Sequence, residues 1–229
     1  IKLSHIGTAG PEKLNKSNVL IVGAGGLGSV AAYYLASSGI GYIGIVDPDT
    51  VELSNLQRQI LHNEKHIGMP KAISAMINLK KLNSEINILP YSEEINKKNS
   101  AELIKLYDVV VACPDNFKTR FILNETCFKL QKPLIVGAAS EFEGHVLDVI
   151  PPQGRCYSCL FEDAKDEDSI QGILAPVAGV IGSIQAVETI KILLSIGKPL
   201  HGKMLIYNAL KGIFREVKFL KKSSCQVCR

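Results

Sequence analysis

Residues 19–28 are Val-Leu-Ile-Val-Gly-Ala-Gly-Gly-Leu-Gly, an apolar run followed at once by a glycine-rich turn. The apolar run predicts a buried strand over residues 19–22, and the alanine-rich stretch after the turn predicts a helix over residues 27–37. Where such a turn joins a strand to a helix, backbone N–H groups at the helix start can hold a phosphate group. The segment therefore indicates a nucleotide-binding unit early in the fold.

Strands and helices are expected to alternate from this unit to residue 144. Further strands are predicted over residues 43–46, 86–91, 109–112 and 134–136, and further helices over residues 71–82, 100–105 and 118–129. This alternation predicts an α/β fold, a Rossmann-like, doubly wound and mostly parallel sheet. Strands predicted over residues 146–150, 204–207 and 214–219 would extend that sheet as C-terminal antiparallel strands. We expect a single domain over residues 1–229, with a nucleotide-binding half (1–144) and a sheet extension with a metal-tied tail (145–229).

Composition sets limits on the class of protein. The chain has 229 residues, 46% of them hydrophobic, which is enough to bury a full core without disordered segments. The net charge of +4 is small, and the lysines are dispersed apart from Lys218, Lys221 and Lys222. A solvated surface explains this pattern better than a nucleic-acid interface does, so no nucleic-acid partner is expected.

Two long uncharged stretches raise the question of a membrane span. Residues 19–46 carry no charge, and a span needs about 20 apolar residues. Seven glycines divide this stretch into a strand, a turn, a helix and a second strand, as in a buried βαβ unit. Residues 170–187 contain Pro176 and Gln185 and continue into Glu188 and Lys191, which favours a buried helix. We therefore expect no membrane partner.

Four of the six cysteines form two Cys-x-x-Cys pairs, Cys156 with Cys159 and Cys225 with Cys228. Four thiolates can hold one tetrahedral Zn²⁺ in a closed, structural site. The alternative is two separate dithiol pairs with redox activity. No signal peptide begins the sequence, so metal thiolates in a reducing, cytoplasmic setting are expected rather than disulfides.

The glycine pattern alone leaves the nucleotide open. Gly-x-Gly-x-x-Gly, followed by Asp47 nineteen residues after Gly28, is also how Rossmann proteins bind the ribose of NAD, so an NAD-dependent oxidoreductase is the alternative. The loop after Asp47 favours a triphosphate instead. Arg58 offers a planar fork for phosphate, Lys71 a compact cation and Asn55 an amide donor.

A second polar cluster, Cys113-Pro-Asp115-Asn116, follows the predicted strand over residues 109–112. Doubly wound sheets place ligands at the carboxyl ends of their strands. Asp115 is a candidate for Mg²⁺ bound to phosphates. From the local sequence, capping of the following helix is the favoured role for the same side chain, and the two roles are compatible.

Seven motifs then occur in a fixed order. They are Gly-x-Gly-Gly-Leu-Gly (23–28), Asp-x-Asp-x-Val (47–51), Ser-Asn-Leu-Gln-Arg-Gln (54–59), Gly-x-x-Lys (68–71), Asp-Asn-x-x-x-Arg (115–120), Cys-Tyr-x-Cys-Leu (156–160) and Cys-x-x-Cys (225–228). Together they cover essentially the whole chain, which resembles the MoeB/ThiF family of ubiquitin-activating-enzyme-like adenylyltransferases. The resemblance implies a homodimeric enzyme that uses ATP and Mg²⁺ to adenylate the C-terminal Gly-Gly carboxylate of a ubiquitin-like sulfur carrier. It would release pyrophosphate and serve molybdopterin or thiamine synthesis.

The resemblance also implies roles for individual residues. Arg58, Lys71 and Asp115 would support catalysis, with Asp115 holding Mg²⁺, and the four paired cysteines would hold structural zinc. The candidate nucleotide-binding residues are Gly23, Gly25, Gly26, Gly28, Asp47, Asp49, Ser54, Asn55, Leu56, Gln57, Arg58, Lys71, Asp115 and Asn116.

Two departures from the family pattern qualify these roles. Family members begin with an arginine-rich segment, which does not appear here, where the sequence starts Ile-Lys-Leu-Ser-His. We expect a disordered or trimmed N-terminus rather than a true loss of that segment. Its absence is the feature that favours a third possibility, a non-catalytic protein that binds ATP or a carrier. Asp168 stands where relatives have a cysteine that can link to the carrier, so we expect the reaction to stop at the adenylate and another protein to insert sulfur.

The remaining polar residues have simpler expected roles. Cys113 and Cys127 are expected to pack in the interior. His62 and His66, in the polar loop before Gly68, could contact the nucleotide or the carrier, but they are expected to be solvated. Carrier recognition is expected to use the sheet extension and the acidic loop over residues 162–168.

Overall fold

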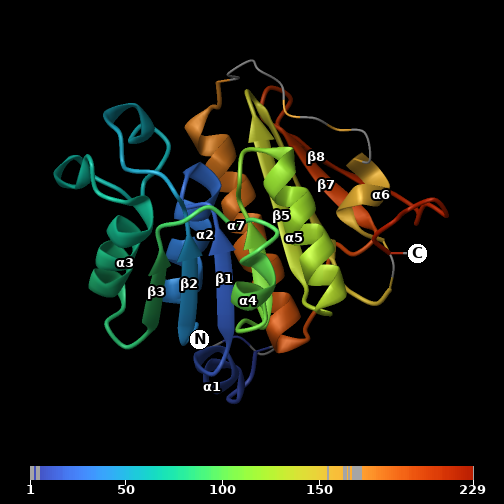
Figure 1. Ribbon diagram of the computed structural model, residues 1–229, viewed down its shortest axis with the longest axis horizontal. Coiled ribbons are helices and arrows are strands. Elements are labelled where there is room, and N and C mark those ends of the chain that lie inside the picture. The colour runs from blue at the N-terminus through green and yellow to red at the C-terminus, as the bar shows by residue number, and fades with distance from the viewer. Residues whose placement is uncertain are drawn as a thin grey trace.

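The computed structural model describes residues 3, 6–153, 155–161, 164, 166 and 172–228. One eight-stranded sheet has the order β3-β2-β1-β4-β5-β6-β7-β8 (Figure 1). Its strands are β1 (Asn18–Val22), β2 (Tyr42–Val46), β3 (Asn87–Tyr91), β4 (Val109–Ala112), β5 (Leu134–Ser140), β6 (Glu143–Val149), β7 (Lys203–Asn208) and β8 (Ile213–Lys218). Strands β1 to β5 pair in parallel, and β6, β7 and β8 continue the sheet in antiparallel pairs. The predicted doubly wound sheet with an antiparallel extension is confirmed.

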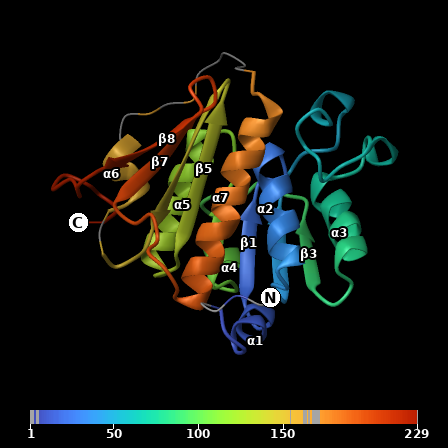
Figure 2. The ribbon, with the colours of Figure 1, turned by 180° about the vertical axis from the view of Figure 1, so that it is seen from behind.

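Helices cover both faces of the sheet. They are α1 (Gly10–Asn15), α2 (Gly26–Ser37), α3 (Lys71–Leu82), α4 (Ser100–Ile104), α5 (Phe117–Lys129), α6 (Tyr157–Phe161) and α7 (Ala175–Leu194), with the short 3₁₀ helices η1 (Leu53–Asn55) and η2 (Glu64–His66). Figure 2 shows α2, α3 and α7 on one face, with α4 and α5 behind the sheet. Because strand side chains alternate, Val19 and Ile21 of β1 enter one core while Leu20 and Val22 enter the other. A strand that is buried on both faces is uniformly apolar, which explains the first motif.

The predicted and observed elements differ where the length of a strand depends on its pairing partner. Helix α3 and strand β4 have the predicted bounds, whereas β5 continues from residue 136 to Ser140. Only residues 134–136 of β5 pair with β4, and the extension pairs with β6 alone. The hairpin therefore lengthens the strand, and the local sequence did not reveal it. Helices α1 and α6 were also not predicted.

Helix α7 is long and apolar enough to cross a bilayer by length and composition. In the structure it lies against α2 and over β5 and β6, with half of its most apolar window buried. Its Gln185 is fully buried and donates to the carbonyl oxygens of Ala112 (2.8 Å) and Ile135 (3.4 Å), on two neighbouring strands. This is the packing of a core helix, as the polar residues of the segment predicted.

The polar motifs meet at the carboxyl ends of the parallel strands, which form one edge of the sheet. Parallel strands β1, β2 and β4 end at the same edge, so the glycine turn, the loop over residues 47–70 and the segment over residues 113–116 meet there. Helices α2 and α3 both begin at this edge. Helix N-termini attract anions, which makes this edge the place to examine for a ligand site.

Candidate functional site

The glycine turn is tightly packed against the end of β4. Gly23 has φ +97°, and a Cβ there would lie 2.7 Å from the carbonyl oxygen of Cys113. A Cβ on Gly28 would lie 1.8 Å from the carbonyl oxygen of Gly23. Gly25 is the N-cap of α2 and makes no side-chain cap, so the backbone there is open to an anion. These glycines allow α2 to begin directly on the sheet edge.

Replacing Gly28 with Ala is expected to destabilise the fold by about 3 kcal/mol, because the new methyl group overlaps backbone that cannot rotate away. Chemical denaturation measures the change. Gly179→Ala in α7 is the matched control, since a Cβ there has no neighbour within 4 Å. It should be neutral or gain up to about 1 kcal/mol from helix propensity. Equal stabilities for the two variants would contradict the packing argument.

The loop over residues 54–59 lies across the glycine turn. A Cβ on Gly26 would lie 3.7 Å from Cγ of Arg58, and one on Gly25 would lie 3.6 Å from Nε2 of Gln59. Helix η1 fixes the start of the loop, with Asn55 buried and Ser54 exposed. The Arg58 guanidinium reaches the Ser54 carbonyl oxygen at 3.4 Å. The predicted loop residues and the predicted glycines thus lie together.

Asp47 directly follows β2, and its carboxylate binds the backbone of the glycine turn. Its Oδ2 accepts a hydrogen bond from the Ala24 N–H (2.7 Å) and its Oδ1 from the Asp49 N–H (2.9 Å). Burial raises the pKa of the Asp47 carboxyl above its usual value, while these two hydrogen bonds and the nearby Lys71 oppose the rise. The carboxylate therefore organises the site as well as lying within it.

Lys71 is the first residue of α3 and points its charge to the same edge. Its side chain is only 7% exposed, and Nζ lies 2.8 Å from Oδ2 of Asp49, whose side chain is 65% exposed. Their backbones are also joined, by the Lys71 N–H and the Asp49 carbonyl oxygen (2.8 Å). A buried ammonium with one solvated partner is well placed to pair with an anionic ligand.

The expected cap of α5 is wrong. Asn116 is the N-cap, and its Oδ1 accepts from the Thr119 N–H at 2.8 Å, so Asp115 is exposed and spared that role. The reason is the register of the helix, which begins one residue later than a cap at Asp115 requires. Arg120 is buried and donates from Nη2 to the Pro114 carbonyl oxygen (2.8 Å), which braces the turn that presents Asp115. The spacing of the Asp-Asn-x-x-x-Arg motif was the only signal for this brace.

The expectation that His62 and His66 are solvated is also wrong. His62 is 6% and His66 7% exposed, and both rings contact the hydroxyl of Ser74, on α3. The second ring nitrogen of His62, Nε2, lies 2.9 Å from the carbonyl oxygen of Ala24. The loop folds back onto α3 and the glycine turn, which its polar composition did not predict.

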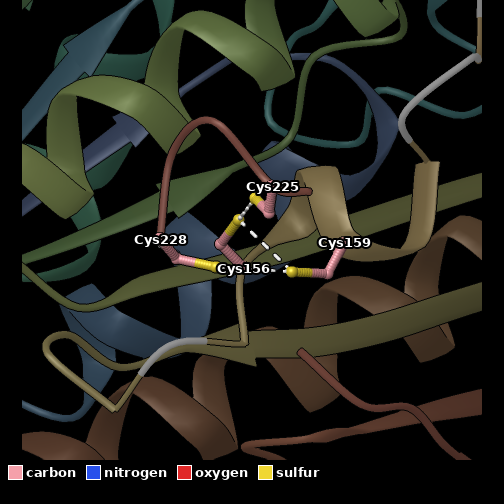
Figure 3. A group of neighbouring side chains, drawn as sticks. All are labelled: Cys156, Cys159, Cys225 and Cys228. Atoms are coloured by element: carbon pink, nitrogen blue, oxygen red, sulfur yellow. Dashed lines mark hydrogen bonds between the residues drawn. The ribbon is translucent and has the colours of Figure 1, made fainter. Parts of the chain in front are cut away.

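The four paired cysteines come together where the start of α6 meets the C-terminal tail (Figure 3). Their Sγ atoms all lie within 4.8 Å of one another, and all four residues are buried. Sγ–Sγ distances are 4.0 Å for Cys156–Cys159, 3.5 Å for Cys156–Cys225 and 3.4 Å for Cys159–Cys228. Thiolates around a tetrahedral Zn²⁺ lie about 3.8 Å apart, since each Zn–S bond is about 2.3 Å. The donor set therefore fits one metal ion better than two independent dithiol pairs.

The other two cysteines pack in the interior as predicted. Burial raises the pKa of the Cys113 thiol to about 12, and Cys113 donates to Oε1 of Gln185 (3.3 Å). Burial also raises the pKa of Cys127, which is fully buried in α5. The predictions for Asp168 and for most of the acidic loop lie outside the described residues.

Fold and site together define a Rossmann-like α/β protein with a glycine-lined edge that carries both basic and acidic side chains, and with a separate four-thiol cluster. The chain belongs to the ThiF family, whose model matches residues 1–227. This confirms the resemblance found in the motifs.

Two curated relatives are similar to this chain along its whole length. The chain is 41% identical over 232 residues to "Adenylyltransferase and sulfurtransferase MOCS3" of Xenopus laevis, covering 99% of this chain and 51% of the relative. It is 44% identical over 234 residues to the protein of the same name from Anopheles gambiae, with 100% and 53% covered. The chain thus spans about half the length of these relatives.

Solved structures share the fold. E. coli MccB crystallised with ATP superposes with a TM-score of 0.87 at 26% identity, over 96% of this chain and 68% of that chain. MccB with MccA-N7isoASN gives a TM-score of 0.87 at 25% identity, over 95% and 68%.

Proposed function

We propose that this protein adenylates the C-terminal Gly-Gly carboxylate of a ubiquitin-like sulfur carrier, with ATP as the donor and pyrophosphate as the product. The observation that carries the proposal is the convergence of two helix N-termini, the buried Lys71, Arg58 and the exposed Asp115 on one sheet edge. The names of the MOCS3 relatives and the ATP complex of MccB support this choice of reaction.

The carrier's carboxylate needs little activation. A C-terminal carboxyl group has a pKa of about 3.3–3.7, so at neutral pH it is already an anion able to attack the α-phosphorus. Catalysis then requires positioning and stabilisation of the charge that develops as pyrophosphate leaves. Lys71 would exchange its bond to Asp49 for a phosphate oxygen, and Arg58 would lie over the phosphates from the loop above the turn.

Two further groups complete the nucleotide site in this proposal. Asp47 would meet the ribose, and residues 54–58 would line the nucleotide with Asn116 beside it. Mg²⁺ on Asp115 would neutralise phosphate charge, as this ion commonly does with one or two carboxylates. Asp115 suits that role because it is exposed and does not cap α5.

The metal of the four-cysteine cluster is proposed to be Zn²⁺ in a structural role. Four thiolates leave no open position for substrate. The cluster lies within the core on the α5 and α6 side of the sheet, so its metal would hold the C-terminal tail against the domain.

We propose that the reaction of these 229 residues ends at the acyl adenylate. Sulfur transfer needs an accessible thiol to carry the sulfur, and all six cysteines are buried. A partner or region outside these residues would supply the sulfur, which agrees with relatives that are about twice as long and named for both activities.

The partners are part of the proposal. Strand β8 has two exposed apolar side chains, Ile213 and Phe214, which would suit a protein surface such as the carrier. A homodimer is proposed as in the family pattern, and Tyr34 of α2 and Val187 of α7 are exposed apolar or aromatic side chains that a second copy could cover. A cytoplasmic location is also proposed, because a reducing compartment would keep the thiols available to a metal.

ATP–pyrophosphate exchange with Mg²⁺ tests the function. Molybdopterin-type and thiamine-type carriers are added in turn, each intact and each without its final glycine. Exchange that depends on one intact Gly-Gly terminus is expected and would identify the carrier. ATP binding without exchange would favour a non-catalytic protein, and binding of NADH without ATP would favour the oxidoreductase alternative.

A further inference from the structure

A chain of buried polar groups links the loop over residues 56–70 and helix α3 to the glycine turn. Ser74 Oγ lies 2.8 Å from Nδ1 of His62 and 2.7 Å from Nδ1 of His66. Nε2 of His62 lies 2.9 Å from the Ala24 carbonyl oxygen. All three polar side chains are less than 8% exposed, so solvent does not compete for these hydrogen bonds.

The acceptors determine where the protons lie. A carbonyl oxygen only accepts, so Nε2 of His62 carries a proton and donates to Ala24. Burial lowers the pKa of His62, and the charges of Lys71 and His66 lower it further, although the bond to Ala24 opposes this. In the neutral ring Nδ1 accepts from the Ser74 hydroxyl, whose oxygen in turn accepts from Nδ1–H of His66. The Asn78 amide, 3.3 Å from His66 Nδ1, instead donates to the Leu61 carbonyl oxygen at 2.7 Å.

Ala24 is consequently held on both sides. Its N–H donates to Asp47 and its carbonyl oxygen accepts from His62. The peptide group that joins Ala24 to Gly25 is planar and trans, so its C=O and N–H point in opposite directions. With the carbonyl oxygen directed at His62, the Gly25 N–H must point to the opposite side. Within the described ranges no group accepts a hydrogen bond from that N–H.

We propose that His62, supported by Ser74 and His66, is a positioning residue that holds the Ala24–Gly25 peptide with its N–H directed at the phosphates of the nucleotide. The proposal rests on the proposed function for the identity of the ligand. Neither His62 nor His66 would touch the carboxylate or the α-phosphorus. Their contribution is that the turn is already in its binding conformation before ATP arrives, which lowers the ordering cost of binding.

Two substitutions at His62 separate the hydrogen bond from the ring. His62→Phe keeps an aromatic ring but removes both ring nitrogens, whereas His62→Gln retains an amide N–H near the position of Nε2. Calorimetric titration with ATP and Mg²⁺ should give a dissociation constant about tenfold weaker for His62→Phe. His62→Gln should remain within about threefold of the unmodified protein. In the exchange assay the loss should appear in KM for ATP, with kcat changed less than KM.

Hydrogen–deuterium exchange of the ATP-free protein supplies a readout independent of the reaction. The peptide covering residues 19–30 should exchange faster in His62→Phe than in His62→Gln, and His201→Phe, a histidine on a different part of the fold, should leave it unchanged. Equal ATP affinity of the Phe and Gln variants, or equal exchange of that peptide, would overturn the role of His62. Absence of ATP binding in the unmodified protein would instead overturn the proposed function. The hydrogen–deuterium exchange of residues 19–30 would still decide the role of His62.

Discussion

Replacing Lys71 with Met is expected to lower carrier-dependent ATP–pyrophosphate exchange by about 10²- to 10³-fold, the typical cost of removing one group that stabilises transition-state charge. Lys71 is buried and lies at the start of α3, so its charge acts through little solvent and points at the proposed phosphates. Met keeps the length and apolar stem of the side chain. The loss should therefore come from the charge rather than from packing, and steady-state exchange rates measure it.

A lysine on the same helix provides the control. Lys81→Met, near the exposed end of α3, should change the exchange rate by less than about twofold, since solvent and salt screen a remote surface charge. Thermal melts must show Lys71→Met folded. A Lys71→Met protein with full exchange activity would exclude Lys71 from the phosphate site.

Replacing Cys225 with Ser is expected to release the proposed metal and to destabilise the protein by at least about 4 kcal/mol, because loss of a bound metal is among the few causes of exceptionally large destabilisation. The Sγ atoms of Cys225 and Cys156 are 3.5 Å apart, so Cys225 brings the C-terminal tail against the start of α6. The remaining three thiolates would be left close together without a cation. Elemental analysis of the purified protein should show about one zinc per chain before the change and almost none after it.

Cys127→Ala distinguishes metal loss from the loss of any buried thiol. Cys127 is fully buried but lies outside the four-cysteine cluster. This variant should keep its zinc and should lose only the modest stability expected of a small cavity, about 1 kcal/mol. Unchanged zinc content in Cys225→Ser would show that the four thiolates do not share one metal.

Much of the architecture could be predicted because its signals are local. The signals are the apolar run of β1, the glycine turn and the periodic pattern of α3. Each is formed by residues that are close together in the sequence, so the elements lie nearly where expected. The hairpin of β5 and β6 was missed because its extension depends on a partner strand rather than on its own residues. Helix α7 was recognised as buried from Pro176, Gln185, Glu188 and Lys191, and the structure gives its bounds as Ala175–Leu194.

In the candidate site, too, local signals were predicted and features that depend on the tertiary structure were not. The motifs identified which residue types take part, and their order along the chain placed them in the ThiF family. They did not show that Asn116, not Asp115, caps α5, since that depends on the exact start of a helix.

By itself, the sequence determined the strand–turn–helix beginning, the family and the two Cys-x-x-Cys pairs, because glycine sterics, apolar periodicity and cysteine spacing operate over short distances in the chain. Only the tertiary structure decided that His62 and His66 are buried against Ser74 and that His62 holds the carbonyl oxygen of Ala24. It also decided that Asp49 pairs with Lys71. Burial and hydrogen-bond partners are set by residues that are distant in the chain, and a polar loop has the same composition whether it faces solvent or packs against a helix.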